Sequence, residues 1–232
     1  MKNRLLTIAL ASVCAIGMIS CGNPAGPDDF VLTTENVDEC IEKIGTYEGL
    51  TVTAVKDEVT DSAVKKYADY YYELLAKENN LTDENGETLP MTDETIAALD
   101  SKVYKNSNEF MVYIRETVFS FAEYDYENKI VSEVIKSATE TSEFKKIPKA
   151  LINKEKEYIN EQFKEAAENY SIEVDYYLEL CGTSVDELSE EYAKEEIVLY
   201  KIASILGIDD ENTDEMKNAV NEYILLVTSV AE

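Results

Sequence analysis

Residues 144–207 decide the fold: FKKIPKALINKEKEYINEQFKEAAENYSIEVDYYLELCGTSVDELSEEYAKEEIVLYKIASILG. Apolar residues recur there at three- and four-residue steps, which predicts two amphipathic helices joined by a short helical segment. Pro148 suits the first turn of the first helix, because its missing N–H would have no partner there. Ser184 and Glu187 have the spacing of a capping box for the second helix, which Gly207 is expected to end. The stretch holds no residue set suited to bond chemistry, so we expect it to present helical surface.

Apolar spacing of the same kind predicts further helices before and after this stretch. Their expected positions are residues 34–45, residues 60–79, a short helix capped by Thr92, residues 107–141, and a terminal helix from Asn212 or Thr213 to about Val230. The helix over residues 107–141 contains neither Gly nor Pro and would be roughly 50 Å long at 1.5 Å per residue. That length predicts an elongated molecule with helical arms.

One segment favours a β-strand instead. Residues 49–55 (GLTVTAV) alternate in polarity and contain β-branched residues. A lone strand cannot satisfy its backbone groups, and residues 30–32 (FVL) are the obvious partner nearby. The predicted fold class is therefore mainly α: an elongated multi-helix bundle with helical arms and at most one small β element near residues 30–55.

The first 20 residues have the pattern of a signal peptide. Lys2 and Arg4 precede an apolar run, LLTIALASVCAIGMIS, which is shorter than the about 20 residues that a spanning helix needs. The run leads into Met18-Ile19-Ser20-Cys21-Gly22, which resembles the lipobox of bacterial lipoproteins, although Met18 stands where Leu is usual. In such proteins the peptide is cut before a cysteine that becomes acylated, with palmitate for example. We expect Cys21 to be lipidated; an ordinary secretory peptide cut nearby is the alternative.

The expected domain organisation follows from this N-terminus. Residues 1–20 are the lipoprotein signal peptide, residues 21–33 a flexible stalk, and residues 34–232 a helical domain. The stalk contains GNPAGPDD, whose Gly, Pro and Asp residues favour a flexible spacer. The domain is expected on the extracytoplasmic face of the cell membrane, held there by lipid.

Charge limits the partners. Removing Lys2 and Arg4 with the signal peptide leaves 19 basic residues against 48 acidic ones, a net charge of −29. We expect no nucleic-acid partner for so acidic a chain, because binding to phosphates requires Lys and Arg. Basic or unfolded polypeptides remain possible partners, and the charge would keep exposed apolar surface soluble.

The sequence predicts no active site, metal or cofactor. Histidine, the commonest general base and metal ligand, is absent from all 232 residues. The acidic clusters at residues 83–87 and 209–211 do not match a calcium loop, and a solvated turn and a helix N-terminus explain them better. Cys40 and Cys181 either pair or remain small half-buried thiols; the second alternative is favoured.

Aromatic residues give the one positive indication of a binding site. The 16 tyrosines include clusters that are too dense for one helix face to bury. A ring with a polar tip suits a wet, adhesive surface, although packing where two helices cross is an equal alternative. The candidate contact residues for a polypeptide are Tyr70, Tyr71, Tyr72, Phe119, Tyr124, Tyr126, Tyr176 and Tyr177.

Several segments resemble a known family in order and spacing. Ile147-Pro148-x-Ala150-Leu151-Ile152-x₂-Glu155, then Gln162-Phe163, then the run from Tyr177 to Leu188 (YLELCGTSVDEL) resemble the C-terminal chaperone domain of bacterial trigger factor. Residues 47–52, 59–61, 91–94 and 108–115 resemble segments that precede, flank and follow that family's isomerase domain. The resemblance implies an extended helical cradle, similar to that of SurA-like chaperones, which holds unfolded polypeptides.

Departures from the family narrow this expectation. The interval from Thr60 to Met91 has room for a helix and a loop but not for the family's FKBP-like isomerase domain. A signal peptide and stalk stand in place of the ribosome-binding domain. We therefore expect a lipid-anchored holdase without a cofactor, whose partners are unfolded or secreted polypeptides and not the ribosome. A structural or adaptor lipoprotein with one dedicated partner, or a degenerate prolyl isomerase, are the alternatives.

Overall fold

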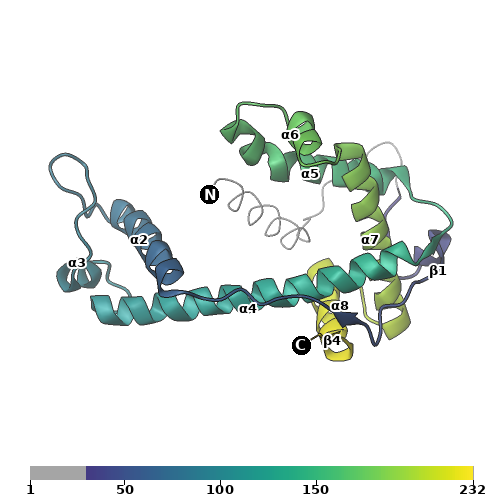
Figure 1. The fold of residues 1–232 in the computed structure, drawn as a ribbon, viewed down its shortest axis with the longest axis horizontal. Helices are drawn as coiled ribbons and strands as arrows, with labels where there is room; N and C mark the ends of the chain where they lie inside the picture. Colours follow the sequence, from purple (N-terminus) through teal and green to yellow (C-terminus); the bar gives the residue numbers. More distant parts are fainter. Residues whose placement is uncertain (1–29, 232) are drawn as a thin grey trace. The chain divides into compact units, whose positions relative to one another are not determined.

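The computed structural model describes residues 30–231, so the predicted signal peptide, Cys21 and most of the predicted stalk lie outside the described residues (Figure 1). The chain divides into two compact units. Residues 55–127 form what we call the inserted unit, and residues 30–54 with 128–231 form the main unit. Each unit has its own packing and is described separately.

The fold is mainly α, as predicted. The described chain forms seven α-helices: α2 (Asp61–Glu78), α3 (Asp93–Ala98), α4 (Ser107–Glu140), α5 (Lys149–Asn169), α6 (Val174–Leu180), α7 (Val185–Leu206) and α8 (Thr213–Val227). The remaining elements are the 3₁₀-helix η1 (Val37–Glu39) and the strands β1 (Ile41–Lys43), β2 (Thr51–Val52), β3 (Glu143–Phe144) and β4 (Ser229–Val230). Helix α4 is continuous over 34 residues, close to the predicted bounds.

The stretch that decides the fold forms α5, α6 and α7. Ser184 caps α7, since its hydroxyl oxygen accepts a hydrogen bond from the Glu187 N–H at 3.1 Å. Gly207 ends the helix with φ of 67°, a left-handed conformation that costs glycine little. Pro148 lies one position earlier than predicted, at the N-cap of α5.

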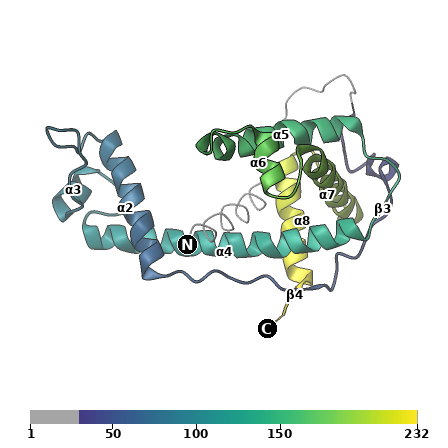
Figure 2. The same ribbon diagram turned by 45° about the horizontal axis from the view of Figure 1, so that its top comes forward.

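Helix α7 is the centre of the main unit. α5 packs along one side of it, and α8, η1 and β1 also contact it (Figure 2). The fully or almost fully buried apolar side chains of α7 and α8 are Ala193, Ile197, Val198, Leu199, Ile202, Ala203, Met216, Val220 and Ile224. A helix that is buried on several sides loses the single-stripe pattern of a surface helix. The main unit therefore depends on α7 for most of its core.

The predicted helix over residues 34–45 is wrong. Only η1 is helical there, and β1 follows it and pairs antiparallel with β3. The Cys40 carbonyl accepts a backbone hydrogen bond from Lys145 N–H at 2.8 Å, and Cys40 is fully buried. An isolated helix of this length is marginal, so pairing with a distant segment and burial decide the local structure. Gly45 lies against the end of α4, where its N–H donates to Ser142 Oγ at 2.8 Å.

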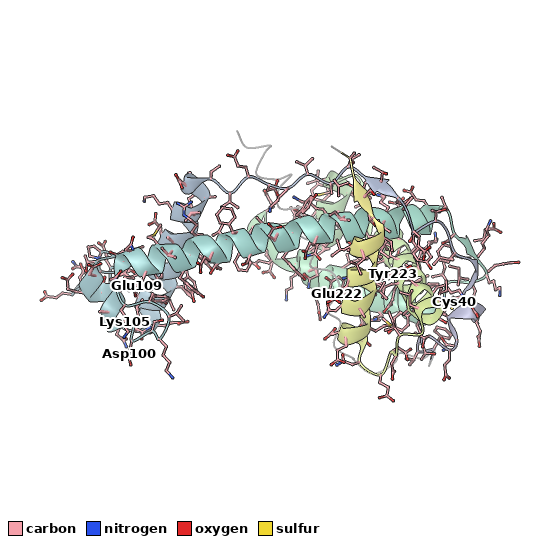
Figure 3. All side chains as sticks on the ribbon, turned by 90° about the horizontal axis from the view of Figure 1, so that it is seen from below. Cys40, Asp100, Lys105, Glu109, Glu222 and Tyr223 are labelled. Carbon is pink, nitrogen blue, oxygen red and sulfur yellow. The ribbon has the colours of Figure 1, made fainter. Side chains whose placement is uncertain are left out.

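The predicted pairing of residues 49–55 with residues 30–32 is also wrong. β2 pairs in parallel with β4, whose Ser229 N–H donates to Leu50 O at 2.9 Å. Nearby, Tyr223 of α8, which is labelled in Figure 3, donates its hydroxyl to Glu48 Oε1 at 2.6 Å. The terminal helix ends at Val227, three residues earlier than predicted, because the chain then turns extended to form β4.

The inserted unit has a core of its own. Thr60 caps α2 as predicted, with its hydroxyl oxygen accepting from Ala63 N–H at 3.2 Å. Thr92 and Thr95 form a reciprocal capping box at α3. The buried residues of this core are Val64, Ala68, Tyr72, Ala76, Ile96, Tyr104, Phe110 and Ile114. Short capped helices of this kind are stable because their apolar faces meet the start of α4.

Across residues 30–231, no helix combines the length and the apolar character that crossing a membrane requires.

The close approach of Gly45 to α4 can be tested by adding one methyl group. In Gly45→Ala, the new Cβ would overlap Thr141 Oγ1 and the carbonyl oxygen of Ala138. We expect a loss of about 1–3 kcal/mol in the free energy of unfolding, because a backbone oxygen cannot move aside easily. Urea unfolding checks this, with Ser132→Ala on the exposed side of α4 as the control. A midpoint equal to that of the control would contradict the close packing.

Candidate functional site

The end of α5 and helix α6 expose apolar side chains in the main unit. Tyr170, Tyr176 and Leu180 are 57%, 52% and 66% exposed. Tyr176 and Leu180 are four residues apart on α6 and therefore share one helix face. Tyr170 contacts Tyr177, also on α6, with a ring-centroid distance of 6.0 Å. We call Tyr170, Tyr176 and Leu180 the α5–α6 surface.

Backbone geometry fixes the turn that carries this surface. Ser171 has φ of 56°, and its N–H donates to Glu168 O while the Ile172 N–H donates to Ala167 O. These two bonds form a Schellman motif, which ends α5 and reverses the chain. Gly182 ends α6 with the same pair of bonds and φ of 84°. The two turns hold α6 against the end of α5.

A small core supports the α5–α6 surface from beneath. Tyr177 is 7% exposed, and its ring lies 6.1 Å from that of Phe163 on α5. Ile159, Ala167, Leu178 and Val185 complete the cluster. Burial, with a smaller contribution from Cys181, raises the pKa of the Tyr177 hydroxyl above its ordinary value. The exposed residues are therefore mounted on a packed base.

The inserted unit contains a row of aromatic rings that runs from its core to its surface. Tyr104 and Phe110 are buried, Tyr71 stacks on Phe110 with centroids 6.3 Å apart, and Tyr67 stacks on Tyr71 at 6.0 Å. Phe121, which is 52% exposed, meets the Tyr67 ring edge-on at 5.8 Å. We call these five residues the aromatic row. Burial raises the pKa of Tyr67 and of Tyr71 above the ordinary value of a tyrosine hydroxyl.

Further apolar side chains are exposed on the same unit. Tyr70 and Leu74, four residues apart on α2, are 63% and 42% exposed. On α4, Val112, Phe119 and Tyr124 are also exposed. Singly exposed apolar residues are normal, but this density on helices with a packed core is typical of a contact surface.

One family model matches the chain. Residues 108–198 match the C-terminus of bacterial trigger factor protein (TF). The match covers nearly all of α4, the whole of α5 and α6, and α7 as far as Val198. It confirms the predicted resemblance over these residues, while the resemblances at residues 47–52, 59–61 and 91–94 lie outside it and stay predictions. No curated protein and no solved structure matches the chain.

The α5–α6 surface lies within the segment that matches trigger factor, and so do Phe119 and Phe121. Tyr67, Tyr70, Tyr71 and Leu74 precede it. The C-terminal domain of trigger factor is a chaperone-type module without catalytic function. The match therefore favours these surfaces, rather than a catalytic site, as the candidate functional site.

The structure separates the eight predicted contact residues into three groups. Tyr70, Phe119, Tyr124 and Tyr176 are exposed, and Tyr71 and Tyr126 are half-buried. Tyr72 and Tyr177 are buried core residues, so their predicted contact with a polypeptide does not fit this structure. For these two, packing between elements is the right interpretation. The first six belong to the inserted unit except for Tyr176, which lies in the main unit.

Sequence reasoning missed six exposed or half-exposed residues of these surfaces. They are Tyr67, Leu74, Val112, Phe121, Tyr170 and Leu180. Tyr170 and Phe121 continue the apolar stripes of their helices, and nothing in the local pattern distinguishes them from the buried members of those stripes. A sequence could indicate such exposure only where the apolar stripe of a helix is longer than the helix that packs against it.

The two described cysteines are free thiols. Cys40 is buried, and burial raises the pKa of its thiol, which makes it unreactive. Cys181 is half-buried at the end of α6. Between residues 30 and 231, no three His, Cys, Asp or Glu side chains are grouped so that they could hold a metal ion.

The correction at Tyr72 can be tested against its neighbour Tyr70. The Tyr72 hydroxyl lies 3.0 Å from Leu89 O and 3.2 Å from Pro90 O, and donates its hydrogen bond to these carbonyls. In Tyr72→Phe we expect a loss of about 1 kcal/mol in the free energy of unfolding, because the part-buried hydrogen bond from this hydroxyl is lost. Tyr70→Phe should leave it unchanged. Thermal unfolding of both variants checks this; equal stabilities would show that the Tyr72 hydroxyl contributes nothing.

Proposed function

We propose that this protein is a holdase-type chaperone that binds unfolded polypeptides through exposed apolar side chains on its helices. The observation that carries the proposal is the match of residues 108–198 to the trigger factor C-terminus, a segment that includes the α5–α6 surface. Tyr170, Tyr176 and Leu180 are exposed there on a packed base.

The chemistry of these side chains suits weak binding to many sequences. Burial of apolar surface contributes roughly 25 cal/mol per Å² and has no directional requirement. Tyrosine adds a hydroxyl that can bond to a polypeptide backbone. Three partly exposed side chains provide only a few contacts at once, so a bound client would dissociate readily. A chaperone needs that property in order to release its clients.

The charge of the chain supports the same proposal. The full sequence has 48 acidic residues against 21 basic ones, a net charge of −27. Such a charge keeps exposed apolar surface from self-associating and favours clients with basic segments. The proposed activity needs neither a cofactor nor a metal, because binding alone prevents aggregation.

We further propose that the protein acts outside the cytoplasmic membrane, anchored by lipid at Cys21. The support is the sequence pattern at residues 1–22, with a basic start, an apolar run and a lipobox-like end. Two acyl chains would hold the protein firmly, because each buried CH₂ contributes about 0.8 kcal/mol. The clients would then be secreted polypeptides and the ribosome would not be a partner.

The holdase proposal predicts suppression of aggregation by the soluble chain from Asp28. A reduced, denatured client should scatter less light when this chain is present in molar excess. In the triple variant Tyr170→Ser/Tyr176→Ser/Leu180→Ser, we expect at least about fivefold more protein to be needed, because the apolar contact area is lost. Circular dichroism confirms that the variant is folded.

A matched control carries serine at exposed apolar positions outside the matched segment. Val31 and Leu226 are 65% and 84% exposed, and Val31→Ser/Leu226→Ser should suppress aggregation as well as the unaltered chain. No suppression by the unaltered chain at several-fold molar excess would count against the holdase proposal. Equal activity of the triple variant would place client binding elsewhere.

The anchor is tested by substituting Cys21 in the full-length chain. Cys21→Ser should lose metabolic labelling with a fatty acid and should leave the membrane fraction, because the acylated thiol is removed. Cys14→Ser, within the apolar run, is the control and should keep the label. Continued labelling of Cys21→Ser would rule out this cysteine as the lipid site.

A further inference from the structure

Four charged side chains are brought together where α5, α7 and α8 meet in the main unit. Lys154 Nζ lies 2.7 Å from Glu196 Oε1 and 4.0 Å from Glu155 Oε1. Glu155 is 8% exposed, and Lys217 on α8 is 7% exposed. We call Lys154, Glu155, Glu196 and Lys217 the ionic cluster. Charged residues are rarely buried to this extent unless they are paired, so the balance of charges here matters.

Every element packed around the cluster contributes titratable groups. Glu195 and Tyr200 lie on α7, and Lys136 of α4 and Glu191 of α7 act on Glu195. Asp214 at the start of α8 acts on Lys217, and Asp210 acts on Tyr200. Each of these groups belongs to the main unit.

Glu155 lies farther from the Lys154 ammonium group than Glu196 does. The Lys154 ammonium group forms its close ion pair with Glu196, at 2.7 Å. The carboxylate of Glu155 lies 4.0 Å from the same ammonium group. Within the described chain, Glu196 Oε2 is buried without a hydrogen-bond partner. Two ionised carboxylates at this site repel one another, while Lys154 and Lys217 attract both of them. Burial first, and then the charge of Glu196, raise the pKa of Glu155 to about 7.

We propose that the ionic cluster is a protonation-controlled lock, which holds α5 firmly against α7 when Glu155 is neutral and loosens it when Glu155 is ionised. The inference concerns the mobility of α5 and does not depend on the proposed function. Because α5 and α6 carry the α5–α6 surface, the lock would set how freely that surface moves.

The direction of the effect follows from proton binding. The pKa of Glu155 is about 7 when α5 is packed, against an ordinary value of 4.5 when the carboxyl is exposed to water. Between these values the packed state binds more protons than the open state. The stabilisation is therefore present at low pH and is lost as the pH rises through about 7. Glu195, whose pKa is also raised to about 7 by burial and by Glu191, acts in the same direction.

Opening should be local rather than a global unfolding. Leu151, Ile159 and Phe163 are buried along α5. Their apolar contacts still favour the packed state after Glu155 ionises, so α5 opens only part of the time. Helix α7 keeps its contacts with α8, η1 and β1. Segments that open separately from the rest exchange their amide hydrogens faster than the core does.

Hydrogen exchange measured peptide by peptide tests the lock. The amides of α5 are compared between the unaltered chain and Glu155→Gln at pH 5.5 and at pH 8, where both proteins share the same intrinsic exchange rates. We expect the ratio of exchange rates, unaltered over Glu155→Gln, to rise at least about tenfold from pH 5.5 to pH 8. The amides of α2 should show no such change.

Glu161→Gln, at an exposed position of α5, is the matched control and should follow the unaltered chain at both pH values. A ratio that is the same at both pH values would overturn the proposal and leave Glu155 as a structural residue only. If Glu155→Gln does not fold, the hydrogen exchange of the unaltered chain alone tests the proposal. After correction for intrinsic rates, its α5 protection must fall at least about tenfold between pH 5.5 and pH 8. Constant protection would overturn the proposal.

Discussion

The packing of α5 along α7 is the contact on which both the α5–α6 surface and the ionic cluster depend. It buries Leu151, Ile159 and Phe163 of α5 and leaves the end of that helix, with α6, beyond the main core. The α5–α6 surface needs this arrangement, because apolar side chains remain exposed only where no further element covers them. The same contact buries charged residues of α5, α7 and α8. The packing of α5 on α7 therefore produces both the α5–α6 surface and the ionic cluster.

Local signals explain why the helices were predictable. Thr60, Ser184 and Gly207 act within one turn of their own helix, so their roles can be read from a few neighbouring residues. The β pairings could not be read in this way. β1 finds its partner about a hundred residues later, and β2 pairs with β4 near the end of the described chain. For residues 34–45, such distant partners outweighed a local pattern that favoured a helix.

The candidate site was predictable only in part, because exposure is set by tertiary packing. Tyr70 and Tyr72 differ little in sequence context, yet one is 63% exposed and the other 4%. The turn at Ser171 was not foreseen either, because a serine with positive φ carries no signal comparable to that of Gly182. The ionic cluster had no signal at all. Lys154 and Glu155 look like ordinary surface charges in a chain of which 30% is charged.

The parallel pair of β2 and β4 has a consequence for the order of folding. Strands so far apart in sequence can meet only after the intervening chain has been made, and closing so large a loop is slow. In a chain that emerges from its N-terminus onward, the carbonyls of Leu50 and Val52 must wait for Ser229 and Ala231 before they gain their backbone donors. The inserted unit has its whole core within residues 55–127, so it can complete its fold much earlier. Synthesis would therefore produce a finished inserted unit before the main unit is closed.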